Sequence, residues 1–213
     1  MVDVTTDSKD PISRAVALIK AGLVKEAIKH LRSYLEEHPE SIEAWYNLGY
    51  SLSLDDDLEE AVKAYDEALA IDNGIFEIWF NKATTLYDLR DFEKAKECYE
   101  TALEIDPEDP EAWNNLGNCF SRLAEGKKAI EAYTRAVALK PDYAEAFYNK
   151  ANAHFIEGED EKALAYADLA VELNPELAKR VAQWIKVAEN RLASKREHEE
   201  YLEKRKKSRT ATE

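Results

Sequence analysis

The chain has 213 residues, of which 44 are Asp or Glu and 29 are Lys or Arg, giving a formal net charge of −15 at pH 7. Nucleic acids and anionic membrane surfaces attract positive charge, so this balance argues against a general binder of either kind and permits a basic partner. The two cysteines, Cys98 and Cys119, are too few for a disulfide or metal framework.

Residues 1–7 form a short, polar N-terminal lead with acidic side chains. A secretory signal would have a basic start followed by an apolar stretch, and the lead has neither. No apolar run elsewhere approaches the length that crosses a bilayer. We therefore expect a cytoplasmic protein that makes no contact with membranes.

Residues 8–177 repeat with a period of 34 residues. Aromatic side chains recur at this interval at Trp45, Trp79, Trp113 and Phe147. Small side chains recur at Ala61, Ala95, Ala129 and Ala163, and tyrosines at Tyr65, Tyr99 and Tyr133. A fixed period of this length is typical of a solenoid, in which each unit packs only against its neighbours. The repeat divides into five units, 8–41, 42–75, 76–109, 110–143 and 144–177.

Each unit is predicted to contain two helices. In the second unit, IEAWYNLGYSLSL and LEEAVKAYDEALAI both place apolar residues at helical spacing, with a break at residues 55–57 between them. Asp10 before Pro11, and Asp109 before Pro110, have the form of an N-cap followed by proline in the first helical turn. The sequence therefore predicts an all-α fold.

A further helix is predicted over residues 178–194, because Val181, Trp184, Ile185 and Ala188 continue an apolar stripe. We expect it to cap the last repeat, and we expect the charged residues 195–213 to be a frayed tail. Residues 1–177 carry a net charge of −20, whereas residues 178–213 carry +5. The repeats are therefore acidic and the tail is basic.

This pattern resembles the tetratricopeptide repeat (TPR) family, whose unit carries W-x2-L-G-x2-Y followed by Ala, Phe or Tyr, Ala and Pro at set places. Trp45, Leu48 and Gly49 match it, as do Trp113, Leu116 and Gly117, and the resemblance covers about four fifths of the chain. The first unit departs from it, with Pro11 in the tryptophan column. The resemblance implies a right-handed α-α superhelix whose first helices line a concave groove that binds another protein.

Asparagines mark this implied groove. Counted from the first residue of each unit, position 6 holds Asn47, Asn81, Asn115 and Asn149, and position 9 holds Asn118 and Asn152. A primary amide both donates and accepts hydrogen bonds, so such a column can pair with the backbone of an extended peptide. The alternative is structural, since asparagine is common at position 6 in the family.

Aromatic and acidic side chains lie beside the asparagines. Position 5 holds Tyr46, Phe80 and Tyr148, while Tyr50 and Tyr87 occupy positions 9 and 12 of their units. These rings suit protein recognition, or they pack within the solenoid. Position 2 holds Glu43, Glu77, Glu111 and Glu145, which complement the helix dipole and would make one groove edge negative.

The chaperone-binding members of the family grip a carboxylate with lysines at set groove positions. Here position 5 reads Ile12, Tyr46, Phe80, Asn114 and Tyr148, so the clamp lysine is missing. Arg122 is the groove cation that we single out. We therefore expect no carboxylate clamp. The expected partner is another protein or peptide, and the acidic repeats permit one of basic character.

No catalytic constellation, cofactor motif or metal-ligand spacing is found in the sequence, so we expect no enzyme activity, no cofactor and no metal. The function predicted is a scaffold that binds an extended or helical protein segment in its groove. Two alternatives stay open: self-association through the terminal faces, and nucleic-acid association through Lys204, Arg205, Lys206, Lys207 and Arg209. The oligomeric state is left open.

Overall fold

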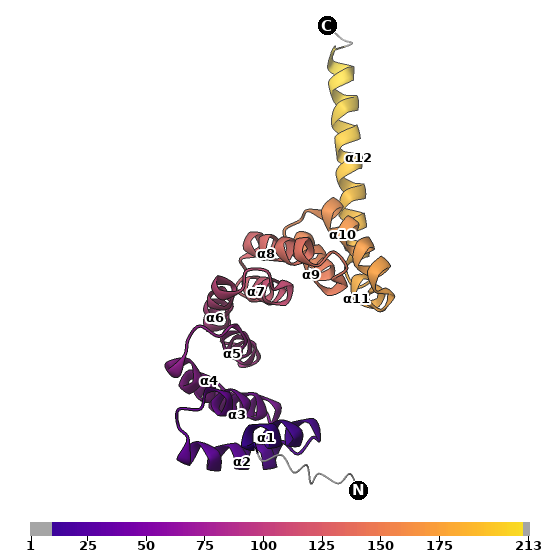
Figure 1. Ribbon diagram of the computed structural model, residues 1–213. Coiled ribbons are helices and arrows are strands. Elements are labelled where there is room, and N and C mark those ends of the chain that lie inside the picture. The colour runs from indigo at the N-terminus through magenta and orange to yellow at the C-terminus, as the bar shows by residue number, and fades with distance from the viewer. Residues whose placement is uncertain (1–9, 211–213) are drawn as a thin grey trace. The chain divides into compact units, whose positions relative to one another are not determined.

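A computed structural model describes the backbone of residues 10–210 and the side chains of residues 10–204, so the N-terminal lead at residues 1–7 lies outside the described part. All of the elements in residues 10–210 are helical (Figure 1). They are α1 Pro11–Lys20, α2 Val24–Glu37, α3 Ile42–Leu54, α4 Leu58–Ile71, α5 Phe76–Asp88, α6 Phe92–Ile105, α7 Pro110–Arg122, α8 Gly126–Leu139, α9 Ala144–Ile156, α10 Asp160–Leu173, the short 3₁₀ helix η1 Pro175–Leu177, α11 Ala178–Val181 and α12 Ile185–Thr210. The predicted all-α repeat fold is confirmed, and consecutive helices from α1 to α10 form one pair in each 34-residue unit.

The chain forms two compact units, one reaching to Cys119 and the other starting at Phe120. The first contains α1 to α6 and most of α7, and the second contains the end of α7 and everything after it. The names first unit and second unit refer to these two compact units, and each 34-residue segment is called a repeat. None of the helices in the described residues has the length and apolar character that crossing a membrane requires.

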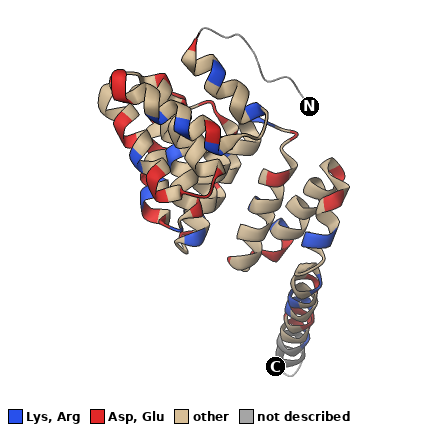
Figure 2. Ribbon diagram, turned by 90° about the horizontal axis from the view of Figure 1, so that it is seen from below, with Lys and Arg blue, Asp and Glu red and all other residues tan. Residues whose placement is uncertain are grey.

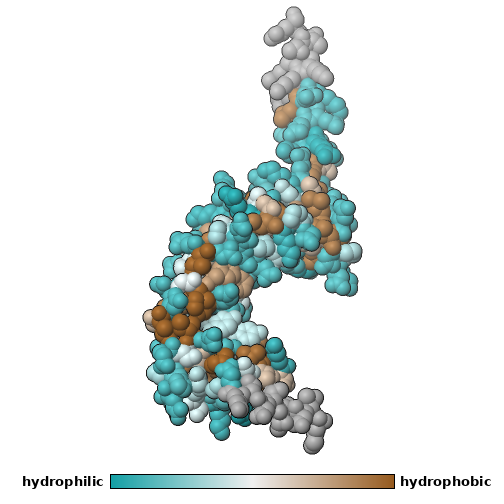
Figure 3. All heavy atoms as spheres, viewed as in Figure 1, coloured by the Kyte–Doolittle hydropathy of each residue, from teal (hydrophilic) through white to brown (hydrophobic). Residues whose placement is uncertain are grey.

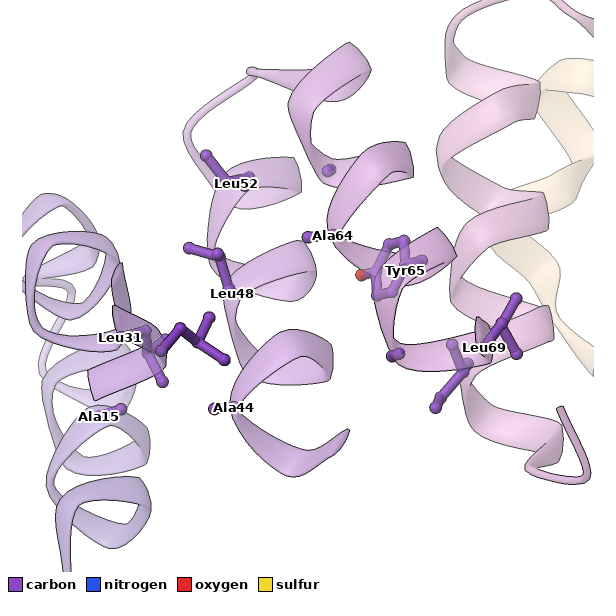
Figure 4. Packing of buried hydrophobic residues seen from close by; sticks show 12 residues of the cluster. Ala15, Leu31, Ala44, Leu48, Leu52, Ala64, Tyr65 and Leu69 are labelled. Atoms are coloured by element: carbon purple, nitrogen blue, oxygen red, sulfur yellow. The ribbon is translucent and has the colours of Figure 1, made fainter. Parts of the chain in front are cut away.

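The core of the first unit is built from alternating large and small side chains. Figure 4 shows Leu31 of α2 and Leu48 of α3 in the space between their helices, and Tyr65 of α4 within the same cluster. Opposite Tyr65 the sequence has Gly49, where an added Cβ would lie 2.7 Å from Cε1 of the ring. Because this distance is too short for a side chain, the glycine lets α3 pack closely against the buried Tyr65 of α4.

The tryptophans at position 4 each form a hydrogen bond to the turn between two repeats. The indole Nε1 of Trp45 donates to the carbonyl oxygen of Pro39 at 2.8 Å, and that of Trp79 donates to Asn73 at 2.8 Å. Trp113 donates in the same way to Pro107 at 2.9 Å. In each case the acceptor lies six residues earlier, so the side chain satisfies a carbonyl of the preceding turn as well as filling space.

The turns inside the repeats share a second periodic feature. One residue in each has a positive φ: Gly22 at 76°, Asp56 at 65°, Arg90 at 63°, Ala124 at 60° and Gly158 at 76°. These positions are 34 residues apart. The next residue donates its N–H to the carbonyl five residues earlier, as Glu125 does to Phe120 at 2.8 Å. This is the bonding of a helix that ends in a left-handed residue, repeated five times.

The C-terminal part of the second unit differs from the single capping helix predicted over residues 178–194. The structure has α11, a break at residues 182–184, and then α12. Val181, Trp184 and Ala188 are buried against α9 and α10, so this segment does cover the last repeat. Leu192 falls 34 residues after Gly158, yet α12 continues through it without a left-handed turn.

Residues 195–210, predicted to be a frayed tail, are helical in the structure and extend α12 (Figure 1). Their Glu, Lys and Arg side chains favour helix, and Lys204 lies 4.0 Å from Glu200 one turn earlier. A helix that starts on the packed Trp184 does not need a new nucleus to continue, since propagation is easier than nucleation.

Candidate functional site

The first helices of the repeats in the first unit begin at defined residues. Ser41 Oγ accepts a hydrogen bond from the N–H of Ala44 at 3.3 Å before α3, and Asp109 Oδ1 accepts from Ala112 at 2.6 Å before α7. These caps and the tryptophan bonds fix where each helix starts. Positions 2 and 5, 2 and 6, 5 and 9, and 6 and 9 of each repeat are three or four residues apart. All four positions therefore lie toward one side of the helix.

We call the residues on this side of α3, α5 and α7 the first-helix face: Glu43, Tyr46, Asn47, Tyr50, Glu77, Asn81, Glu111 and Asn115. The helices that carry it are linked through hydrogen bonds. Asn81 Nδ2 of α5 donates to the hydroxyl of Tyr46 on α3 at 3.1 Å. Tyr99 Oη of α6 lies 2.8 Å from Thr84 Oγ1 of α5.

The asparagines at position 6 bond first to their own helices. Asn47 Nδ2 donates to the carbonyl of Glu43 at 2.7 Å, and Asn81 Nδ2 donates to Glu77 at 2.8 Å. These bonds give part of the column the structural role that was the alternative to ligand binding. Within the described residues the Oδ1 atoms of Asn47 and Asn81 take part in no hydrogen bond, so both amides can still accept one from a ligand.

The fourth repeat uses its asparagines differently. Asn114 is buried, and its Nδ2 donates to Oδ1 of Asn115 at 3.2 Å. Asn115 is half-buried. Asn118 is half-buried and has a partner within the chain. The amides of this repeat are therefore engaged more fully than those of α3 and α5.

The aromatic residues of the first unit divide into packed and exposed rings. Phe80 lies 5.6 Å from Tyr99 edge to face and 5.7 Å from Phe76. Tyr87 makes an edge contact of 5.2 Å with Phe92. Tyr50, in contrast, is 38% exposed. Phe80 and Tyr87 thus pack within the repeats, whereas the ring of Tyr50 is exposed.

Tyr46 lies between these two classes. Its ring is half-buried beside Tyr65, with ring centroids 6.2 Å apart. Burial raises the pKa of the hydroxyl, and the nearby carboxylate of Glu77 raises it further. The hydroxyl therefore stays protonated and can donate a hydrogen bond, since Asn81 already donates to it.

Three carboxylates lie along one edge of the first-helix face. Glu43, Glu77 and Glu111 are exposed, and none of them forms an ion pair within the described residues. Each sits in the first turn of its helix, where a negative charge complements the helix dipole. Figure 2 shows how widely Asp and Glu are spread over the helices. The edge of the first-helix face is therefore negative and has no cation of its own.

The second unit holds the remaining predicted residues, Arg122, Tyr148, Asn149 and Asn152. Arg122 is exposed and Asn149 is half-buried, and both have partners within the chain. Asn152 is half-buried on α9. The predicted groove residues thus belong to both compact units.

Tyr148 is covered by the C-terminal segment. The guanidinium carbon of Arg180 lies 3.9 Å from the centre of its ring, and Arg180 also forms two hydrogen bonds with Glu145, at 2.7 and 2.8 Å. Further along α9, Trp184 stacks on Phe155 at 4.9 Å and Arg191 lies over the same ring at 4.4 Å. The ring of Tyr148, at position 5 of the last repeat, is therefore covered by a contact within the chain.

Sequence reasoning missed Thr84 and Arg180. Thr84 occupies position 9, the position of Tyr50 and Asn118, and only this shared register could have drawn attention to it. Arg180 lies outside the five units, so its contact with Glu145 and Tyr148 had no sequence signal.

Neither thiol of the chain is placed for nucleophilic chemistry. Burial raises the pKa of Cys98 to about 11 and that of Cys119 to about 12, so both stay protonated at neutral pH. The described residues bring together no group of three or more His, Cys, Asp or Glu side chains that could hold a metal ion.

Comparison with known families gives matches along most of the chain. Models described as "Tetratricopeptide repeat" match residues 12–74, 76–109, 110–143 and 144–177. A comparison with curated protein sequences gives no significant match.

Several solved structures share the fold. MamA from Desulfovibrio magneticus RS-1 has a TM-score of 0.74 and 20% identity, covering 78% of this chain and 94% of that one. YrrB, described as "a TPR protein with an unusual peptide-binding site", has a TM-score of 0.73 and 23% identity, covering 84% and 92%. PilF from Pseudomonas aeruginosa has a TM-score of 0.70 and 23% identity, covering 86% of each chain. Identities this low establish similarity of fold.

Proposed function

The chain belongs to the tetratricopeptide repeat family, and from that premise we propose that it is a non-catalytic scaffold whose first-helix face binds an extended or helical segment of another protein. The observation that carries the proposal is the exposed Tyr50, one turn from Asn47 on α3, together with the amide oxygens of Asn47 and Asn81, which take part in no hydrogen bond within the described residues. These groups supply a contact ring and hydrogen-bond acceptors on one side of adjacent helices. The similarity to YrrB, which is described as having a peptide-binding site, supports the same kind of ligand.

The partner segment is basic. Glu43, Glu77 and Glu111 form an acidic edge without cations, and residues 1–177 carry a net charge of −20. The chain itself provides an example of the contact, because Arg180 pairs with Glu145 and stacks on Tyr148. A guanidinium suits such a site since it can pair with a carboxylate and lie on a ring at once.

The test begins with an array of short synthetic peptides rich in Arg, Lys and aromatic residues. Binding of the best peptide to the full chain is then measured by fluorescence anisotropy. A surface charge contact contributes up to ~1 kcal/mol, so we expect the triple variant Glu43→Gln/Glu77→Gln/Glu111→Gln to weaken binding about tenfold or more.

The matched control removes the same charge from the second helices. Glu67, Glu100 and Glu104 are exposed on α4 and α6, and changing all three to Gln should leave the affinity within about twofold. Equal weakening by both triple variants would show that only the overall charge matters. That result, or an array without a binder, would overturn the proposal.

A further inference from the structure

The C-terminal end of the second unit has an open hollow where a repeat would normally continue. The hollow measures about 440 Å³ and is lined by Asp168, Val171 and Glu172 of α10, by Ala178 and Val181 of α11, and by Ala182 and Ile185. Most of this lining is apolar. In Figure 3 hydrophobic surface is visible near the base of α12.

The repeat register identifies what the hollow would receive. Tyr65, Tyr99 and Tyr133 are the buried tyrosines of the second helices, each no more than 2% exposed. Tyr201 lies two periods of 34 residues after Tyr133, and so falls in the same column. It is 58% exposed, because α12 runs straight through Leu192 where a turn would have folded the chain back.

The register also identifies the contact that Tyr201 lacks. Tyr65 packs against Gly49 and beside Tyr46, at positions 8 and 5 of its unit. If the register is continued into a sixth repeat, residues 178–211, these two positions are Ile185 and Ala182. Both line the hollow. Because position 8 is Ile185 rather than glycine, Tyr201 would lie over the open hollow instead of entering a closed gap between two helices. The continuous helix α12 keeps Tyr201 away from the hollow of its own chain.

Charge favours the same contact. The α10 side of the hollow carries Asp168 and Glu172, whereas Lys204 follows Tyr201 by one turn and begins the basic sequence that ends at Arg209. The positions that hold Ala61 and Ala68 in α4 hold Glu197 and Lys204 in α12. The end of α12 therefore cannot be buried along its whole length as α4 is. It would dock through Tyr201 and the neighbouring Leu202, which is 40% exposed.

We propose that the hollow at Ala182 and Ile185 binds Tyr201 of a second copy of this chain, and that two copies exchange the ends of α12 to form a dimer. A reciprocal exchange uses the same pair of surfaces twice and closes the assembly at two copies. This contact does not involve the first-helix face and is independent of the function proposed above.

The test is sedimentation of the full chain over a range of concentrations. We expect a dimer, and we expect Tyr201→Ala and Ala182→Glu each to raise its dissociation constant at least tenfold. Tyr201 and Ala182 are exposed in the single chain, so neither variant should disturb the fold, which circular dichroism checks. Tyr50→Ala, at another exposed tyrosine, is the matched control and should leave the dimer unchanged.

Mixing the two variants gives a sharper result. The Ala182→Glu chain keeps Tyr201, and the Tyr201→Ala chain keeps its hollow, so a mixed dimer retains one intact contact. We expect the mixture to dimerise more tightly than either variant alone. A wild-type chain that stays monomeric at every concentration, a Tyr201→Ala chain that dimerises like wild type, or a mixture without this gain would each overturn the proposal.

Discussion

The energetic cost of the left-handed backbone conformation in these turns can be tested by removing one methyl group. Ala124, between α7 and α8, has φ of 60°, and its counterparts Gly22 and Gly158 have φ of 76°. An L-residue in this conformation costs ~1–2 kcal/mol, because Cβ approaches the carbonyl oxygen. Glycine avoids that cost but loses about 0.4–1 kcal/mol through the greater freedom of the unfolded chain. We therefore expect Ala124→Gly to raise the free energy of unfolding by about 0.5–1 kcal/mol.

The assay is urea unfolding followed by circular dichroism, with thermal unfolding as a second measurement. A gain of this size corresponds to an increase of about 1–4 °C in Tm for a chain of this length. Ala124 is exposed, so the substitution removes no buried contact.

Two controls separate the backbone effect from the loss of a methyl group. Ala165 is exposed in the middle of α10, where the same change to Gly should cost about 1 kcal/mol. Gly158→Ala should also destabilise, although nothing lies within 4 Å of the added Cβ. The reasoning would be refuted by an Ala124→Gly chain less stable than the parent, or by a Gly158→Ala chain of unchanged stability.

Three further substitutions test the packing and the pH response. Gly49→Ala should lower stability by about 1–3 kcal/mol, because its Cβ would collide with the buried ring of Tyr65; an unchanged Tm would contradict this. Trp79→Phe keeps a ring but loses the 2.8 Å bond to the Asn73 carbonyl, and urea unfolding should show a loss of at least about 0.5–1.5 kcal/mol. A variant as stable as the parent would count against that bond. Burial lowers the pKa of His154 below its ordinary value, so the unfolded chain binds the proton more readily. The free energy of unfolding should therefore fall as the pH drops below about 6.5, and His154→Gln should reduce this slope; an equal slope in both proteins would refute the assignment.

The sequence predicted the repeat architecture well because its packing constraints recur at a fixed interval. Gly49 and Tyr65 must be small and large for one steric reason, and that reason returns in every unit. The left-handed turns share the same interval but not a residue type, since Gly, Asp, Arg and Ala all occupy the position. A conformation tolerated by several side chains leaves no compositional signal. The left-handed conformation of these turns was therefore visible only in the structure.

The candidate site was predicted less completely. The register gives Asn47 and Asn81 the same position in their helices, but it could not show that each amide donates to its own backbone. Nor could it show that Phe80 packs on Tyr99 while Tyr50 stays exposed, because both are aromatic residues at first-helix positions. The extension of α12 was missed for another reason. Its charged residues suit a solvated end, but Glu, Lys and Arg also favour a continuous helix.

Hydrogen-exchange mass spectrometry of the full chain, with and without the best basic peptide from the array, tests the central claim most directly. Binding to the first-helix face should slow exchange in α3 and α5 and leave α10 to α12 unchanged. Slower exchange confined to α10–α12, or to the second helices α4 and α6, would contradict the proposed binding face.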